Sequence, residues 1–259
     1  MMVRRADPGR VLTALVAQAD AVVTWLSGQP PSAWRRPSVL PGWTVAELAT
    51  HIAAVLASIP ATLRQPTGDR PVSLAGYLAG YRKVAEEILE RDVAGAAGRS
   101  PAEVLADIYA QRDEAAAAEP PSTRAVRAPR GPISPADFLV TRAIELVVHA
   151  DDLSRSLPER EPVALDRGAL RVACQALADV LAERAPGRAL ELRVPPYAAV
   201  QAVGGPRHTR GTPPNVVETD SLTWVRLAAG RATWADAVEG SLVHASGERA
   251  DLAPWLPLL

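Results

Sequence analysis

A helical repeat of apolar residues through about the first 155 positions most limits how this chain can fold. Between residues 11 and 26, apolar side chains recur at spacings of three and four, as one buried helical stripe requires. They are Val11, Leu12, Leu15, Val16, Ala19, Val22, Val23 and Leu26. Gly28 ends this first predicted helix.

Helix-start signals predict four further helices in the same region. A Ser or Thr stands at each predicted start, and a Glu three positions later completes a capping box at the first and third. The predicted helices cover about residues 44–63, 73–89, 100–118 and 136–157. Residues 119–133 hold five prolines or glycines and are predicted to form a long connection. Long helices with moderate connections favour an antiparallel helical bundle.

The pattern changes after a predicted linker at residues 156–164, which places two prolines among charges. A helix is predicted at 166–185, and alternating apolar and polar residues then predict strands at 189–194, 198–203, 216–219 and 241–245. Two short helices are predicted between the last two strands. The expected fold class is therefore α+β, with a helical bundle over residues 1–157 and a small α/β domain over residues 165–259.

Composition excludes several classes of function. The 259 residues carry 28 Lys and Arg against 29 Asp and Glu, which argues against the basic face that nucleic-acid binding needs. Cys174 is the sole cysteine, so an intramolecular disulfide or a cysteine metal cluster cannot form. We find no signal peptide and no apolar run of about 18 residues, so we expect a cytoplasmic protein that does not enter a membrane.

Two histidines and a glutamate form the candidate chemical site. Glu145 and His149 are four residues apart, so their side chains leave one helical face a turn apart. With His51 from the second helix they give two imidazoles and one carboxylate, a set suited to Zn²⁺ or a similar divalent ion. The alternatives at this point are a surface ion pair and a structural histidine. His208 and His244 have no partner at ligand spacing and are expected to be exposed or structural.

Three segments carry a resemblance to a known family. They read LPGWTVAELATH at 40–51, ELVVHADDL at 145–153 and TDSLTWVRLAAGR at 219–231. The first two resemble the mycothiol-dependent maleylpyruvate isomerase family, whose N-terminal domain is a DinB-like helical bundle. The third looks like the sterol-carrier-like domain fused to many of its members. The resemblance implies that His51, Glu145 and His149 are metal ligands and that mycothiol is the thiol co-substrate.

The resemblance also implies roles for residues around the ligands. Arg231 matches an arginine thought to bind the substrate carboxylate, although it could instead cap helix carbonyls. Arg142 could hold Glu145 or an anionic ligand. Asp152 could accept an imidazole N–H or only solvate the helix end. Trp43 is expected to anchor the second helix, and Cys174, in an apolar helical context, to be a buried structural thiol.

The implied activity is that of a metal-dependent and mycothiol-dependent isomerase or thiol transferase. Its substrate would be a small electrophilic or carboxylate-bearing molecule. One alternative is a non-catalytic protein whose sterol-carrier-like domain binds an apolar ligand. Another is a metal-dependent hydrolase that uses metal-bound water. Neither the substrate nor the oligomeric state can be predicted from the sequence.

Overall fold

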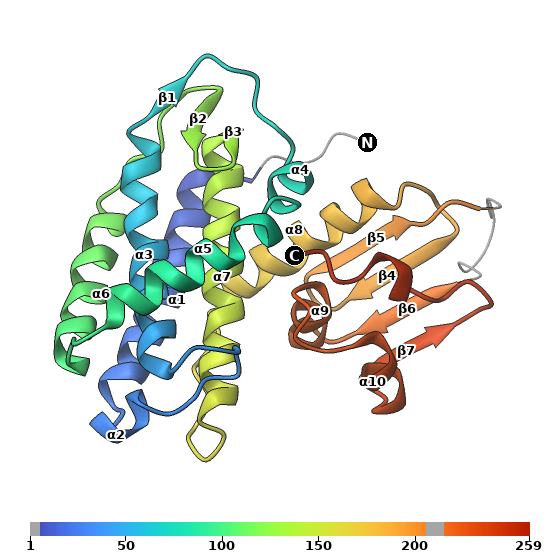
Figure 1. The fold of residues 1–259 in the computed structure, drawn as a ribbon. Coiled ribbons are helices and arrows are strands. Elements are labelled where there is room, and N and C mark those ends of the chain that lie inside the picture. Colours follow the sequence, from blue (N-terminus) through green and yellow to red (C-terminus); the bar gives the residue numbers. More distant parts are fainter. Residues whose placement is uncertain (1–5, 206–214) are drawn as a thin grey trace. The chain divides into compact units, whose positions relative to one another are not determined.

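The structure, a computed structural model, describes residues 6–205 and 215–259, without the side chains of 82–86. The chain divides into two compact units, Met1–Ala169 and Leu170–Leu259. Figure 1 shows a helical first unit and a second unit of helices and a sheet. The α+β prediction is confirmed.

Four long helices make the body of the first unit. They are α1 (Pro8–Ser27), α3 (Val45–Leu63), α6 (Pro101–Ala116) and α7 (Pro135–Ser156). Helices α1 and α3 each pack against both α6 and α7, so the four enclose one core. Helix α5 (Tyr81–Ala96) packs on α3 and crosses the bundle obliquely (Figure 1). The core is lined by the apolar stripes that the sequence predicted, with Leu15, Leu48 and Leu146 each fully buried.

Local capping explains where these helices begin. Ser100 and Glu103 form a capping box at the start of α6, with the Glu103 carboxylate accepting the Ser100 backbone N–H at 2.7 Å. Glu47 accepts the Thr44 backbone N–H at the start of α3 in the same way. Ser134 caps α7 by accepting the N–H of Asp137 at 3.1 Å. The predicted helix starts at these three positions are therefore confirmed.

Two sequence predictions for this unit are wrong. The helix expected over 73–89 is broken at residues 79–80 into α4 (Leu74–Leu78) and α5. The connection expected at 119–133 contains strands β2 (Ala125–Ala128) and β3 (Gly131–Ile133), which pair with β1 (Pro66–Thr67) in an antiparallel sheet. These strands are too short to show a clear alternation of apolar and polar residues. Their apolar residues pack against Tyr77 and Phe138, so contacts with other segments, and not a local sequence signal, stabilise the strands. The Pro-rich turn before α3 contains one helical turn, α2 (Pro31–Trp34).

A buried glutamine holds the predicted linker to the first unit. Gln18 of α1 is fully buried, and its side-chain amide donates to the Ala164 carbonyl at 3.1 Å. Its side-chain oxygen accepts the Asp166 N–H at 2.9 Å. The segment after α7 is thus bonded to α1.

The second unit places helices beside a mixed four-stranded sheet. It contains most of α8 (Arg167–Arg184), β4 (Leu190–Val194), β5 (Ala198–Ala202), β6 (Val216–Thr219), α9 (Ser221–Ala228), α10 (Trp234–Glu239), β7 (Val243–Ser246) and the short 3-10 helix η1 (Ala253–Trp255). The strand order is β5-β4-β6-β7, in which β4 and β6 are parallel and the other pairs antiparallel. Alternate residues of β4 are buried, which is the period-2 pattern that predicted the strand.

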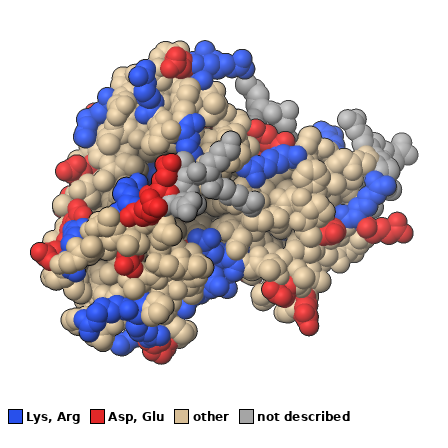
Figure 2. Space-filling model, in the orientation of Figure 1, with Lys and Arg blue, Asp and Glu red and all other residues tan. Residues whose placement is uncertain are grey.

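The distribution of surface charge agrees with the near-neutral composition. On the face shown in Figure 2, acidic and basic side chains are interspersed.

Among the described residues, one helix, α3, is long and apolar enough to span a membrane by length and composition. About two thirds of that stretch, 67%, is buried inside the bundle, as expected for a core helix, so it is weak evidence for a span.

Candidate metal centre

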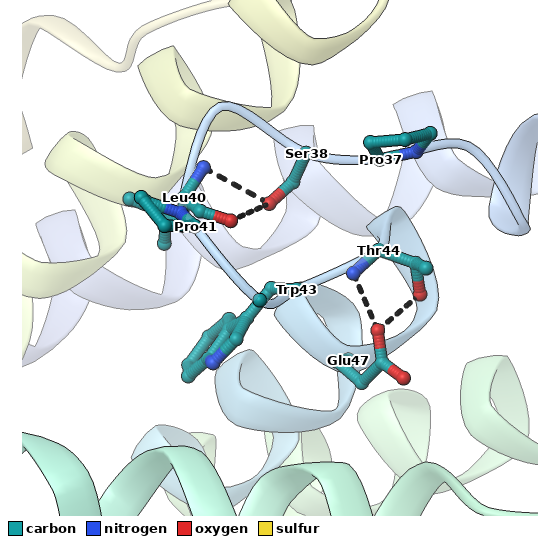
Figure 3. Close-up of a pocket in the computed structure, with 8 residues that line it drawn as sticks. Pro37, Ser38, Leu40, Pro41, Trp43, Thr44 and Glu47 are labelled. Atoms are coloured by element: carbon teal, nitrogen blue, oxygen red, sulfur yellow. Dashed lines mark hydrogen bonds between the residues drawn. The ribbon is translucent and has the colours of Figure 1, made fainter.

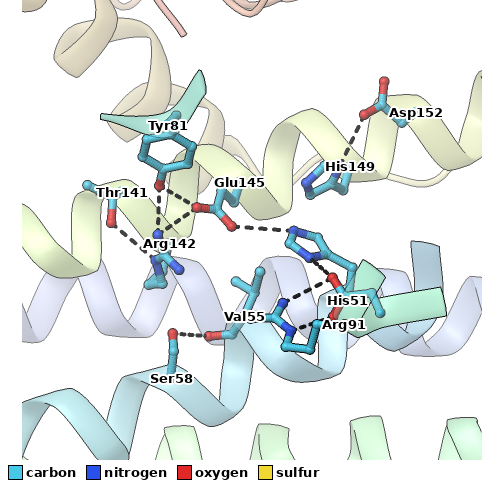
Figure 4. Close-up of polar contacts among 11 residues, drawn as sticks. His51, Val55, Ser58, Tyr81, Arg91, Thr141, Arg142, Glu145, His149 and Asp152 are labelled. Atoms are coloured by element: carbon cyan, nitrogen blue, oxygen red, sulfur yellow. Dashed lines mark hydrogen bonds and ion pairs between the residues drawn. The ribbon is translucent and has the colours of Figure 1, made fainter. Parts of the chain in front are cut away.

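The fold brings the three predicted ligands together. His51 comes from α3, and Glu145 and His149 come from successive turns of α7 (Figure 4). One potential ligand atom from each residue lies within 4.8 Å of the other two. The three residues are only 6–8% exposed. A surface ion pair, one of the alternatives from the sequence, is therefore excluded for Glu145 and His149.

The position of α7 explains why these groups are buried. Every residue of α7 from Phe138 to Leu153 is buried, because neighbouring elements pack around its whole middle. A charged side chain in such a helix cannot reach water and must find its partners inside the protein. Each of the polar groups at this centre does so.

His51 is oriented by a carboxylate on α5. Its Nδ1 lies 2.7 Å from Oδ2 of Asp92, which is 2% exposed. Arg91 in turn donates to Asp92 at 2.8 and 3.0 Å. The other ring nitrogen, Nε2, lies 3.6 Å from Glu145 Oε2, and the centroid of the Trp43 indole lies 5.1 Å from that of the imidazole. The Nε2 nitrogen therefore faces the centre of the site.

His149 has a matching arrangement. Its Nδ1 lies 3.0 Å from Oδ2 of Asp152, which is fully buried. Asp152 therefore lies where an imidazole acceptor was expected. The rings of His51 and His149 meet edge to face with centroids 4.8 Å apart. A carboxylate on Nδ1 fixes the tautomer and orientation of an imidazole and leaves Nε2 as a ligand, as is usual at metal sites.

Glu145 is held by one oxygen and leaves the other toward the histidines. Oε1 accepts from an Arg142 guanidinium nitrogen at 2.6 Å and from the Tyr81 hydroxyl. The same guanidinium nitrogen donates to the Tyr81 oxygen at 2.6 Å, and Nε of Arg142 donates to the Thr141 hydroxyl at 3.1 Å. Arg142 therefore holds Glu145, one of the two roles expected for it.

The surroundings set the protonation states. Burial alone would raise the pKa of Glu145, but the Arg142 charge and His51 hold it well below its ordinary value. Burial and the neighbouring His51 lower the pKa of His149, although Asp152 opposes this shift. Burial also lowers the pKa of His51, but hydrogen bonds to Asp92 and Glu145 outweigh it and leave the pKa raised. Burial raises the pKa of Tyr81, so its hydroxyl stays protonated and donates.

The donor set fits a divalent cation. Two atoms that bind one zinc ion at about 2.1 Å lie no more than about 4 Å apart. The 3.6 Å between His51 Nε2 and Glu145 Oε2 meets this limit, and the full set within 4.8 Å needs only a small contraction. Two imidazoles and one ionised carboxylate would leave a coordination position for water or substrate.

A hollow lies at the start of α3, next to this centre. It has a volume of about 370 Å³ and is lined by Pro37, Ser38, Leu40, Pro41, Gly42, Trp43, Thr44 and Glu47 (Figure 3). Trp43 is 8% exposed. Since its ring also contacts His51, Trp43 connects the hollow with a predicted ligand.

The other residues singled out in the sequence belong to the second unit. Arg231 follows α9 in the second unit, where a guanidinium nitrogen donates to the Ala229 carbonyl at 3.2 Å, the capping contact that was its alternative role. Cys174 is fully buried in α8, and burial raises its pKa to about 12, as expected for a structural thiol. His244 is exposed in β7. His208 lies outside the described residues.

Sequence reasoning missed Asp92 and Tyr81. Both lie on α5, and neither stands at a regular spacing from His51 or Glu145. Arg91 beside Asp92 gave the segment the character of a solvated, charged helix face. Only the packing of α5 against α3 in the structure shows that the Asp92 carboxylate is buried beside His51.

The fold and this site define a class: a helical-bundle domain with a buried His-Glu-His set, followed by a sterol-carrier-like domain. A family model described as the mycothiol maleylpyruvate isomerase N-terminal domain matches residues 12–154. A second, described as a bacterial SCP ortholog, matches residues 166–258. The chain belongs to the mycothiol maleylpyruvate isomerase family, which is a family of enzymes.

Solved structures agree on the fold. The crystal structure of the mycothiol-dependent maleylpyruvate isomerase is 19% identical, with a TM-score of 0.59 and 93% of each chain covered. The crystal structure of a histidine-to-alanine mutant of that enzyme is 20% identical, with a TM-score of 0.57 and the same coverage. A search of curated proteins gave no significant match.

Proposed function

We propose that this protein binds one divalent cation, Zn²⁺, through His51, Glu145 and His149. We further propose that it acts on a small electrophilic or carboxylate-bearing substrate with mycothiol as the thiol co-substrate. The observation that carries the proposal is the convergence of three potential ligand atoms within 4.8 Å in a buried site. The family, and the mycothiol-dependent maleylpyruvate isomerase whose structure is similar, support mycothiol dependence and an isomerase or thiol-transferase reaction.

A divalent cation bound there would favour the deprotonated form of a thiol at neutral pH. The chain's own residues would prepare the site for it. Asp92 and Asp152 hold the two imidazoles with Nε2 inward. Arg142 and Tyr81 fix Oε1 of Glu145, so that Oε2 is presented to the ion. The three side chains are only 6–8% exposed, which would limit the access of water to a bound ion.

We also propose that Arg231 binds a substrate carboxylate, because a guanidinium can pair with a carboxylate through two parallel hydrogen bonds. Arg142 would serve the cofactor site through Glu145. The domain limits 1–157 and 165–259 and a cytoplasmic location remain predictions of the sequence.

The first test is metal content. Protein purified without chelator should carry about one divalent ion, measured by elemental analysis, and His149→Ala should lose it. Metal affinity should fall more than about 100-fold, since outer partners of metal ligands alone are worth 10–100-fold. The matched control is His244→Ala, which changes an exposed histidine of β7. Metal-free protein with an intact His-Glu-His set would contradict the proposal and favour a ligand-binding protein.

Turnover separates the remaining reactions. With metal present, activity should require mycothiol, and Arg231→Ala should raise KM for a carboxylate-bearing substrate while leaving the metal content unchanged. Turnover that proceeds equally well without thiol would overturn the thiol-dependent reaction and indicate hydrolysis by metal-bound water.

A further inference from the structure

A third arginine, after Arg91 and Arg142, lies near this centre without an anionic partner among the described residues. Arg130 is in the two-residue turn between β2 and β3, where Ala128 pairs with Gly131. Gly131 has φ +116°, a conformation that side chains other than glycine rarely adopt, so the turn geometry depends on it. The hairpin thereby carries Arg130 back toward the junction of α4 and α5.

Two tyrosines hold the Arg130 side chain in place. Its guanidinium carbon lies 3.6 Å from the ring centroid of Tyr81 and 4.5 Å from that of Tyr77. Such stacking on aromatic faces fixes a guanidinium without using any of its N–H donors. The stem of Arg130 passes close to Gly80, where a Cβ would lie 3.0 Å from Arg130 Cδ. The absence of a side chain at Gly80 therefore leaves room for the Arg130 stem.

The donors of this guanidinium are unused within the part of the chain that the structure describes. There Arg130 makes no hydrogen bond or ion pair, and its Nε is buried without a partner. The neighbouring Arg142 is different, since it is bonded to Glu145, Tyr81 and Thr141. A partly buried cation that is held firmly yet lacks a counter-charge is costly unless a ligand supplies one.

Tyr81 connects this arginine with the proposed metal ligands. Its ring lies under Arg130, and its hydroxyl donates to Glu145. Only one side chain therefore separates Arg130 from the ligand set. The carboxylates of Glu145, Asp92 and Asp152 exceed the charges of Arg142 and Arg91 by one, so a divalent cation together with Arg130 would still leave the region positive and suited to an anionic ligand.

We propose that Arg130 binds a carboxylate of the small molecule that occupies the metal site. The stacked guanidinium presents a planar edge that matches a carboxylate, and its position places that group on the Tyr81 side of Glu145. This inference rests on the proposed function for the identity of the site, but it assigns a binding residue that the sequence motifs do not contain.

The test uses maleate as a probe in calorimetric titrations of the zinc-loaded protein. Arg130→Gln should weaken maleate binding by at least about tenfold, since a charge-assisted hydrogen bond contributes that much or more. Arg130→Lys, which keeps the charge but loses the planar edge, should weaken it by a smaller factor. Arg127→Gln, which changes an exposed arginine of the same hairpin, should leave it unchanged.

Zinc content measured on the same samples keeps the two proposals apart. It should be equal in all four proteins. An unmodified protein that holds no zinc would contradict the proposed function but not the role of Arg130. Maleate affinity would then be compared in the zinc-free proteins, where the difference between the unmodified protein and Arg130→Gln still reports on the carboxylate contact. If Arg130→Gln does not fold, as thermal melting would show, the decision falls to Arg130→Lys.

Three outcomes would overturn the inference. The first is equal maleate affinity in the unmodified protein and the decisive Arg130 variant. The second is no maleate binding to the unmodified protein. The third is that inorganic phosphate competes with maleate and binds with equal affinity, which would indicate a general anion site instead of a carboxylate site.

Discussion

The interior of the helical bundle and the interior of the second unit are built from different chemistry. In the bundle, ionisable side chains of α3, α5 and α7 are buried together, among them Asp92, Arg142 and Glu145. In the described part of the second unit the buried polar residues are uncharged, namely Asn215, Thr219, Ser221 and Thr223. The Trp224 indole and the Cys174 thiol there bond to backbone carbonyls, at 3.2 and 3.5 Å.

The comparison shows what folding alone requires. A well-packed apolar interior is at least as stable as one that buries an ion pair, because the desolvation of charges offsets their attraction. The second unit uses that simpler solution. The charges in the bundle therefore need a different explanation, and the convergence of His51, Glu145 and His149 supplies one.

The largest expected effect comes from breaking the buried ion pair. In metal-free protein, Glu145→Ala leaves Arg142 as a buried charge without its carboxylate, and we expect the free energy of unfolding to fall by about 3–5 kcal/mol. The double variant Glu145→Leu and Arg142→Met, which gives this region the apolar character of the second unit, should recover most of the loss. Urea unfolding measures both. A loss under about 1 kcal/mol in the single variant would show that the pair is not essential to the bundle.

The next effect is expected from acid, which should destabilise the interior of the bundle more than that of the second unit. The pKa values of Glu145 and Asp92 are lowered in the folded protein, in spite of burial, by Arg142 and His51 for the first and by His51 and Arg91 for the second. Their contribution to stability is therefore complete above their ordinary values near 4 and is lost as the pH falls below them. We expect metal-free bundle to lose stability steeply below about pH 4.

The control for this acid effect is Glu145→Gln, in which the loss should be shallower. His51 adds no slope in that range, since it is protonated there in both the folded and unfolded states. Unfolding followed at several pH values by circular dichroism measures the slopes. Equal slopes for Glu145→Gln and the unmodified protein would contradict the assignment.

A smaller effect is expected from Tyr81→Phe. The variant keeps the ring under Arg130 but removes the hydroxyl that donates to Glu145. Because the same hydroxyl also accepts from Arg142, two hydrogen bonds are lost, at a cost of about 1 kcal/mol of stability each. Metal affinity should fall about tenfold, as for other partners of metal ligands. Competition with a chelator measures the affinity, and Tyr109→Phe at an exposed position of α6 is the matched control.

The smallest effect belongs to the second unit. Cys174→Ala should cost less than about 2 kcal/mol, the scale of a small change in core volume, and leave metal content unchanged. Because burial raises the pKa of Cys174 to about 12, the thiol should react with a thiol reagent only after unfolding. Rapid labelling of the folded protein would show that this interior is more open than its packing indicates.

Sequence reasoning succeeded where signals are local. Caps and periodic apolar residues placed α1, α3, α6 and α7, because these features act within one helix. The hairpin of β2 and β3 was missed because its packing on Tyr77 and Phe138 comes from distant segments.

The same distinction applies to the site. Glu145 and His149 were found by their spacing on one helix, and His51 was added as the histidine of the second predicted helix. Asp92 and Tyr81 were missed, since only the packing of α5 on α3 brings Asp92 to His51, and no spacing along the chain marks such a contact.

The placement of the ligand set on α3 and α7 has a mechanical consequence. These helices are far apart in the chain, so an ion held by His51, Glu145 and His149 would act as a reversible cross-link through the middle of the bundle. Such a link would restrain local unfolding most strongly at the helical turns to which it is attached. Chelation should therefore speed amide hydrogen exchange first in the turns of α3 and α7 that carry these three residues.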